Sequence, residues 1–149
     1  MFKDESFNTN QITLLYQNTY RKNNSHRVVS DLILVRLKGG NRPNEGFIEV
    51  KRSTFSTSDL EPQTWGGICD DNWDKKDADV VCRMLGYPSS VKVYTQSSPF
   101  GHGTGSFVLD DLNCVGTEIS VFNCPHPMPE GNHNCGNSEW AGVKCKTGD

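Results

Sequence analysis

The chain has 149 residues and a formal net charge of −3, with 22% charged and 34% hydrophobic residues. The length predicts one domain, and the negative charge argues against a general nucleic-acid-binding role. The sequence contains no run of about eighteen apolar residues, so we expect no membrane insertion by this chain.

The N-terminal part differs in composition from the rest. Residues 1–31 are polar and rich in asparagine, and we expect a disordered or linker segment there. We expect the folded domain over residues 32–146, followed by a short tail at 147–149. The N-terminus has no apolar run of signal-peptide length. The Asn23 triplet "NNS" matches the N-glycosylation acceptor pattern, which indicates secretion.

The first elements that the sequence predicts after residue 30 are two strands and a third, shorter strand. The run "DLILVRLKGG" at 31–40 is rich in β-formers and ends at two glycines, which predicts a strand. Residues 45–53 alternate in polarity, with Ile48 and Val50 predicted to face inward. A polar loop is expected at 53–63, and "TWGGICDD" at 64–71 predicts the third strand.

The clearest helix follows in "DKKDADVVCRMLGYP". Asp74 is a good N-cap, and Asp77 places a negative charge in the first turn. Apolar residues at helical spacing form one stripe, which we assign to core packing: Ala78, Val81, Cys82 and Leu85. Gly86 suits the left-handed position after the helix, and Pro88 prevents its continuation.

The remaining elements are short. We expect strands at 91–94 and 106–114, a Gly-rich loop between them, a helical turn within "GTEISVFNC" and a final strand in "EWAGVKC". The segment "PHPMPEGNHN" is an irregular loop. These elements predict an α+β fold with a β-dominated core and one main helix.

The six cysteines admit two interpretations. They stand at 69, 82, 114, 124, 135 and 145, with no C-x-x-C pair of the kind that structural zinc sites usually contain. An even number in a Gly- and Pro-rich module indicates three disulfides, for which the sequence alone allows fifteen pairings. Disulfides require an oxidising compartment, so we expect a fragment of a longer secreted or membrane protein. Zinc remains an alternative because His126 and His133 lie between Cys124 and Cys135.

Taken in order, the segments "VRLKGG", "NEGFIEV", "WGGICDDNW", "ADVVCRMLGYP", "LDDLNCVGTE" and "EWAGVKC" resemble a scavenger receptor cysteine-rich (SRCR) domain of the six-cysteine group A. The resemblance covers residues 34–145. It implies a small disulfide-rich fold in which a curved antiparallel β-sheet cradles one main helix. It also implies the disulfides Cys69–Cys135, Cys82–Cys145 and Cys114–Cys124.

The acidic residues near Cys69 are the main candidate site. If Cys69 pairs with Cys135, then Asp70 and Asp71 lie near Glu139, and no basic residue is adjacent to any of the three in sequence. Repulsion among carboxylates favours either raised pKa values or a bound cation, and oxygen ligands suit calcium better than zinc. The resemblance implies a cation site formed by the residues matching Asp70, Asp71 and Glu139. Alternatively, these carboxylates cap turns or face solvent.

Two further groups of charged residues are candidate sites. Asp110 and Asp111 in "LDDLNC" form a second acidic pair and a second candidate cation site. Arg42, Lys51 and Arg52 are candidate ligand-binding residues, although strand alternation places Lys51 and Arg52 on opposite faces.

The sequence departs from the family pattern in four places. Phe47 stands where many members carry a ligand-binding arginine, and Trp140 replaces the aspartate of "E-D-A-G-V". The segment "PHPMPEGNHN" lacks the usual Trp-Gly pair, and the loop 53–63 is longer than usual.

No catalytic motif is present, and six paired cysteines would leave no thiolate, so we expect no enzyme activity from this chain. The expected function is that of an extracellular or cell-surface module that recognises anionic or protein ligands with the help of weakly bound calcium. Its expected partners are extracellular proteins or polyanions. The alternative is a non-catalytic accessory module of a secreted enzyme, a serine protease or a lysyl-oxidase-like protein.

Overall fold

The computed structural model describes the backbone of residues 11–22, 25–54 and 65–148, and the side chains of residues 33–52 and 65–148. Asn23 and residues 55–63 of the predicted loop lie outside the described residues. In the part that is described, no helix is long and apolar enough to cross a membrane.

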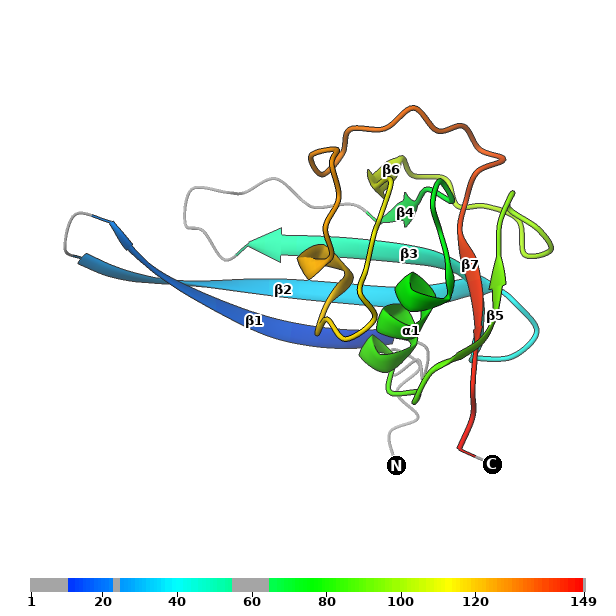
Figure 1. The fold of residues 1–149 in the computed structure, drawn as a ribbon, viewed down its shortest axis with the longest axis horizontal. Coiled ribbons are helices and arrows are strands. Elements are labelled where there is room, and N and C mark those ends of the chain that lie inside the picture. Colours follow the sequence, from blue (N-terminus) through cyan, green and yellow to red (C-terminus); the bar gives the residue numbers. More distant parts are fainter. Residues whose placement is uncertain (1–10, 23–24, 55–64, 149) are drawn as a thin grey trace, which may run out of the picture.

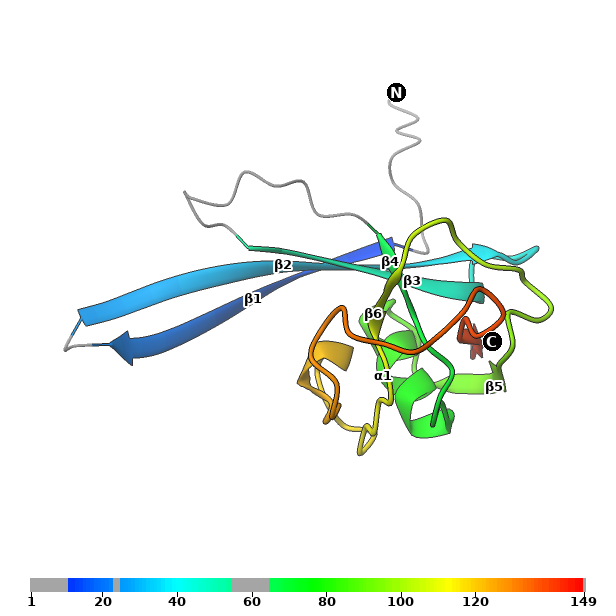
Figure 2. The same ribbon diagram turned by 90° about the horizontal axis from the view of Figure 1, so that it is seen from above.

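A seven-stranded sheet organises the molecule (Figures 1 and 2). Strands β1 (Gln11–Lys22), β2 (Ser25–Gly39) and β3 (Glu45–Thr54) are antiparallel neighbours. The edge of β3 opposite β2 pairs with two strands. Its first residues pair with β7 (Gly142–Cys145), and residues further along pair with β4 (Gly66–Ile68). β5 (Ser90–Tyr94) pairs with β7, and β6 (Phe107–Leu109) pairs with β4.

The structure corrects three sequence expectations about strands. Residues 11–22 and 25–31, expected within a disordered or linker segment, form β1 and the first half of β2, with Ile12 opposite Val35 in the register. Backbone hydrogen bonding to an open strand edge favours the extended conformation even where the side chains are polar. The sheet is antiparallel except for β4 and β6, which are parallel. β6 ends at Leu109, far short of Cys114, and Asp111 has a φ of 55° that a strand does not accommodate.

Helix α1 (Lys75–Met84) confirms the predicted capping. The Asp74 side chain accepts hydrogen bonds from the backbone N–H groups of Lys76 and Asp77, and the Asp77 carboxylate accepts from the backbone of Asp74 in return. Gly86 takes a φ of 91° just after the helix, as expected. The 3-10 turn η1 (Val121–Asn123) lies within the predicted helical turn.

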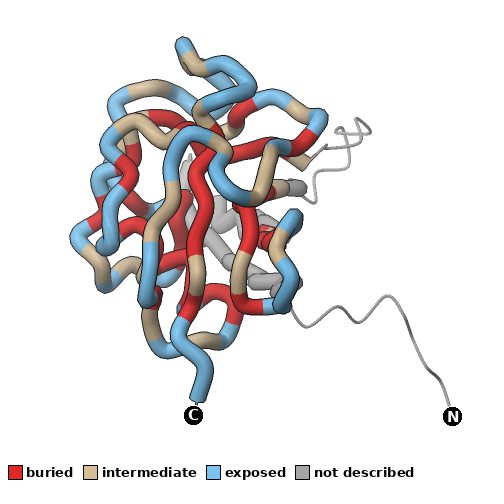
Figure 3. The backbone as a smooth tube through the Cα atoms, turned by 90° about the vertical axis from the view of Figure 1, so that its right-hand side faces the viewer, coloured by how far each residue is buried: buried red, intermediate tan, exposed pale blue. Residues whose placement is uncertain are grey.

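Two layers of side chains cover the two faces of the sheet. On one face, Ile48 and Val50 are fully buried in the main core against α1, as predicted. On the other face, Phe47 and Glu49 are also buried, under Trp140 and the segment that precedes β6. Figure 3 shows the buried residues running along the strands at the centre of the molecule. Both faces of β3 are therefore interior.

The three disulfides are Cys69–Cys135, Cys82–Cys145 and Cys114–Cys124, the pairs that the resemblance implies, and no described cysteine is free. Cys82–Cys145 ties α1 to β7 through the core, and Cys69–Cys135 ties the end of β4 to the segment before β7. The zinc alternative for the cysteines is thereby removed, since all six sulfurs are in disulfide bonds.

Candidate functional site

The Cys69–Cys135 disulfide positions the acidic site. It brings the two Cα atoms to 6.3 Å, and a β-bridge joins Cys69 to Trp140. The backbone N–H of Asp70 donates to the carbonyl of Glu139 at 2.8 Å. Two segments almost seventy positions apart in the chain therefore run side by side, with acidic residues on both.

Asp70, Asp71 and Glu139 converge at this junction. Each offers a carboxylate oxygen, and these oxygens lie within 4.8 Å of one another. All three residues are half-buried, and together with Gln96 and Ser138 they line a shallow pocket of about 560 Å³. The three residues proposed from sequence as one cation site are thus brought together.

Backbone donors orient two of these side chains. Gln96 N–H donates to Asp70 Oδ2 at 2.6 Å, and Gly136 N–H donates to Glu139 Oε2 at 2.6 Å. Gln96 has a φ of 59°, and Asn72, next to Asp71, has a φ of 63°. Left-handed backbone at non-glycine residues is costly, and such strain often accompanies functional sites.

Asp110 belongs to the same acidic site, which the sequence did not reveal. Its carboxylate lies within 4.8 Å of that of Asp71, beside the Cys69–Cys135 sulfurs. The residue is 1% exposed, and neither carboxylate oxygen has a hydrogen-bond partner. Burial and the neighbouring Asp111 raise the pKa of Asp110, although the N–H groups of Asp111 and Asn134 and the His133 ring act in the opposite direction. These N–H groups lie close enough to act electrostatically without forming well-directed hydrogen bonds.

Asp71 stands at the centre of this negative potential. Its pKa is raised, first by burial and then by repulsion from four other carboxylates, those of Asp110, Glu139, Asp111 and Asp70. None of the ion pairs among the described side chains includes any of these five residues. The arrangement concentrates negative charge around one point, and no ion pair among the described side chains balances it.

The three basic candidates are dispersed. Arg42 is exposed in the turn between β2 and β3. Lys51 lies 5.9 Å from the centre of the Trp65 ring, whereas Arg52 binds Glu130 at 2.6 Å and packs over the Phe122 ring. Lys51 and Arg52 therefore face different surroundings, as alternation predicts, and do not form one patch. Their role in ligand binding stays a prediction.

One Ser–His pair has the wrong geometry for nucleophilic catalysis. His133 Nε2 lies 2.9 Å from Ser106 Oγ, but His133 Nδ1 accepts the backbone N–H of Cys135. The proton of the neutral ring therefore sits on Nε2, which donates to the hydroxyl and cannot remove its proton.

Comparison with known proteins agrees with this fold. The family model of the scavenger receptor cysteine-rich domain matches residues 38–146. The macrophage receptor MARCO of Mesocricetus auratus is 56% identical over 112 residues, which are 75% of this chain and 20% of that protein. A scavenger receptor cysteine-rich domain superfamily protein of Patiria pectinifera is 42% identical over 111 residues, 74% of this chain and 9% of that protein. The chain thus spans a fifth or less of the length of these curated relatives.

Two crystal structures are similar over the same share of the chain. The SRCR domain of mouse MARCO, in its dimeric form, is 40% identical with a TM-score of 0.54, covering 74% of this chain and 93% of that domain. The third SRCR domain of murine neurotrypsin is 38% identical with a TM-score of 0.60, covering 74% and 94%. With its three disulfides of the six-cysteine type, this non-catalytic chain belongs to the scavenger receptor cysteine-rich domain family.

Proposed function

We propose that this domain is an extracellular ligand-recognition module whose acidic cluster, Asp70, Asp71 and Glu139, holds a calcium ion. The observation that carries the proposal is the convergence of three carboxylates within 4.8 Å with no ion pair to a described basic residue. Such a site either remains partly protonated or takes a cation.

The residues at the site suit calcium. All of their donors are carboxylate oxygens, which a hard cation prefers, and every cysteine sulfur nearby is in a disulfide. The carboxylate of buried Asp110, within 4.8 Å of that of Asp71, adds negative potential to the site. Calcium takes about six to eight oxygens, so three carboxylates leave part of its shell to water or a ligand. When bound, the ion would supply open positions for an anionic oxygen of the partner.

The protein groups around the cluster have defined roles in this proposal. The Gln96 N–H holds one oxygen of Asp70, and the Gly136 N–H holds one oxygen of Glu139. The second oxygen of each carboxylate is left for a cation. Without a cation, the cluster would repel an acidic ligand. Recognition of anionic or protein ligands by an acidic domain would therefore depend on calcium.

The setting of this function is a secreted or cell-surface protein. Three disulfides are typical of oxidising compartments. One curated relative is a macrophage receptor, which favours a receptor ectodomain over the accessory module of a secreted enzyme. Extracellular proteins and polyanions are the partners that we propose.

A surface coated with polyglutamate, a polyanion without sugar rings, tests this function. We expect retention of the domain in millimolar calcium and at least about tenfold weaker retention after chelation. Glu139→Gln keeps an oxygen for the Gly136 N–H but removes the charge, and it should weaken retention in calcium to a similar degree.

Glu45→Gln, the same change away from the cluster, serves as the matched control and should bind like the unmodified domain. Equal retention with and without calcium would contradict the proposed function.

A further inference from the structure

The segment between η1 and β7 is attached to the rest of the domain by one covalent bond. We call residues 125–139 the strap; in Figure 1 it arches from η1 past β6 to the start of β7. It contains no helix or strand, and none of its residues is buried. Cys135 lies within the strap and is bonded to buried Cys69, which follows β4 directly. This disulfide therefore fastens an otherwise exposed segment to the core.

The other contacts between the strap and the domain are weak ones near the surface. They comprise one ion pair between side chains about one-third exposed, three hydrogen bonds and one edge-to-face ring contact. The residue pairs are Arg52–Glu130, Val108–Gly131, Ser106–His133, Ser97–Asn137 and Phe107–His133. Exposed polar contacts of this kind contribute little stability. The strap can therefore open locally while the core stays folded.

Cys135 is also the cysteine nearest to solvent. The other five cysteines are at most 3% exposed, whereas Cys135 is half-buried. Exchange with a thiol requires a thiolate to reach one of the two sulfurs, so access decides which disulfide reacts. In the folded domain, access favours attack on Cys135 over attack on Cys82–Cys145 or Cys114–Cys124.

Carboxylates surround the Cys135 sulfur. Asp71 Oδ2 lies 3.9 Å from Cys135 Sγ, and a carboxylate oxygen of Asp110 lies within 4.8 Å of the same sulfur. Asp70 and Glu139 stand beside Asp71 in the acidic cluster. None of the ion pairs among the described side chains includes any of these four carboxylates.

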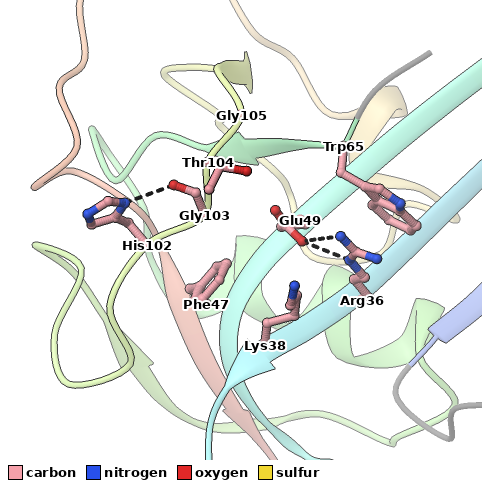
Figure 4. Close-up of a pocket in the computed structure, with 9 residues that line it drawn as sticks. All are labelled: Arg36, Lys38, Phe47, Glu49, Trp65, His102, Gly103, Thr104 and Gly105. Carbon is pink, nitrogen blue, oxygen red and sulfur yellow. Dashed lines mark hydrogen bonds and ion pairs between the residues drawn. The ribbon is translucent and has the colours of Figure 1, made fainter. Parts of the chain in front are cut away.

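Ion pairing distinguishes these carboxylates from the buried one of Glu49. In the pocket between β2, β3 and the loop 102–105, Arg36 donates to Glu49 at 2.7 Å (Figure 4). That charge is neutralised locally, whereas the charge beside Cys135 is not, and an unbalanced charge acts on approaching ions. A thiol that approaches Cys135 therefore meets a negative potential.

We propose that Cys69–Cys135 is a thiol–disulfide exchange site of the folded domain that accepts cationic or neutral small thiols and excludes anionic ones. A thiolate attacks the Cys135 sulfur and forms a mixed disulfide, the bond to Cys69 breaks, and the Cys69 thiolate takes up the proton that the thiol released. A second thiolate attacks the sulfur of the first thiol, which leaves as a symmetric disulfide, and Cys135 is protonated in turn. Two thiols are thus oxidised, one protein disulfide is reduced, and the strap is released.

This exchange depends on the charge of the acidic cluster and on no bound cation. It therefore stands independently of the function proposed above, and its test is run with a chelator present throughout.

A charge series of small thiols provides the test. The native domain is treated at low ionic strength with cysteamine, 2-mercaptoethanol or 3-mercaptopropionate, which are cationic, neutral and anionic. Cysteines freed by the thiol are trapped with N-ethylmaleimide in denaturant and located, with any mixed disulfide, by mass spectrometry of peptides. Each rate is divided by the rate of the same thiolate with a neutral small disulfide, which removes differences in thiol basicity.

Both the position and the charge order of the reaction are predicted. Cys69 and Cys135 should react at least about tenfold faster than the other four cysteines, whose sulfurs a thiolate cannot reach. The corrected rate with cysteamine should exceed that with 3-mercaptopropionate by at least about tenfold, with 2-mercaptoethanol between them. This ratio should shrink in about 0.5 M salt, where screening acts within about 4 Å.

Two variants locate the charge that sets this order. Asp71→Asn removes the charge nearest to the Cys135 sulfur and should reduce the ratio to about threefold or less. Glu45→Gln, the matched loss of a charge elsewhere, should keep the ratio of the unmodified domain.

Hydrogen exchange follows the release of the strap. In the selectively reduced domain, the amide of Gly131, which is bonded to the Val108 carbonyl, should exchange at least about tenfold faster than before reduction. The amides of α1 should keep their protection.

Several outcomes overturn the inference. They are reaction of the other cysteines as fast as Cys69 and Cys135, equal corrected rates for the three thiols, and loss of protection in α1 together with the strap. The last result would mean that the disulfide is reduced only after the domain unfolds. If Asp71→Asn fails to fold, the salt dependence of the thiol series on the unmodified domain decides alone.

Discussion

Trp140 and Phe47, two residues that depart from the SRCR sequence pattern, contact each other. Their rings meet edge to face at 5.4 Å, and Trp140 packs against Phe107 at 5.1 Å. In the family pattern, Phe47 stands where many members carry a ligand-binding arginine, and Trp140 replaces an aspartate. The structure places both in the interior, because the register of β3 with β7 puts Phe47 opposite Gly142. Sequence spacing could not show this contact, since it joins positions almost a hundred residues apart.

This contact predicts that Trp140 contributes strongly to stability. Trp140 is 1% exposed, so Trp140→Ala leaves a large cavity and should lower the free energy of unfolding by about 3–5 kcal/mol. Urea denaturation with the disulfides intact measures this loss. Val91→Ala, at a side chain 55% exposed, is the control and should cost less than about 1 kcal/mol. A comparably small loss for Trp140→Ala would show that the second layer on the sheet is not a packed core.

The acidic site was only partly predictable. Asp70, Asp71 and Glu139 could be grouped because the resemblance implies a disulfide that joins their segments. Asp110 could not be added, because its position depends on how the chain turns after β6, where Asp111 adopts a φ of 55°.

Helix α1 was the most predictable element, and local signals explain why. Its N-cap, capping box and C-terminal glycine are all encoded within a few residues. The sequence did not show that Asp77, besides closing the capping box, accepts the backbone N–H of Cys114 at 2.9 Å. This buried carboxylate therefore links the helix start to the Cys114–Cys124 loop.

Asp77 should make stability depend on pH. Burial raises its pKa to about 7, although the N–H groups of Cys114 and Asp74 act in the opposite direction. The folded domain thus holds this proton more tightly than the unfolded chain, whose value is near 3.8. The contribution of this bound proton to the free energy of unfolding is fully present below about pH 4. It is lost as the pH rises through about 7, and the free energy of unfolding falls by up to about 1.4 kcal/mol per pH unit.

Urea denaturation at several pH values tests this dependence. In Asp77→Asn the part of the slope between pH 4 and 7 that belongs to Asp77 should disappear. Asp79→Asn, at a carboxylate whose pKa is lowered chiefly by hydrogen bonds from Ser90, which outweigh its desolvation, should leave that slope in place. An unchanged slope in Asp77→Asn would mean that its two backbone donors keep the carboxylate ionised.

At the scale of the whole molecule, the three disulfides differ in the length of chain that they close. Cys69–Cys135 and Cys82–Cys145 span 66 and 63 residues, whereas Cys114–Cys124 spans 10. Loop-closure entropy assigns about 4 kcal/mol to each long loop and about 3 kcal/mol to the short one, as upper values.

Paired replacement by alanine tests this ranking. Cys82→Ala with Cys145→Ala should lower the unfolding midpoint more than Cys114→Ala with Cys124→Ala, because the first pair closes the longer loop while all four cysteines lie in the same buried core. The reverse order in urea would show that loop length does not govern the stability of this domain.

The overall fold could be inferred because a long, ordered set of motifs resembles one family. The strand pairing could not, since it depends on non-local register. Residues 11–22 show the limit most clearly. Their polar composition predicted a disordered or linker segment, whereas their backbone pairs along β2.

Protonation should compete with calcium at the acidic cluster. Because the pKa of Asp71 is raised, acidification protonates it at a higher pH than an ordinary aspartate and removes part of the site's charge. Calcium affinity should therefore fall as the solution is acidified.

Calorimetric titration of the domain with calcium tests the central claim most directly. We predict saturable binding with a dissociation constant of about 10⁻⁴ to 10⁻³ M at neutral pH. Asp70→Asn should abolish that heat, while Glu45→Gln should retain it. No heat and no rise in unfolding temperature up to about 10 mM calcium would contradict the account.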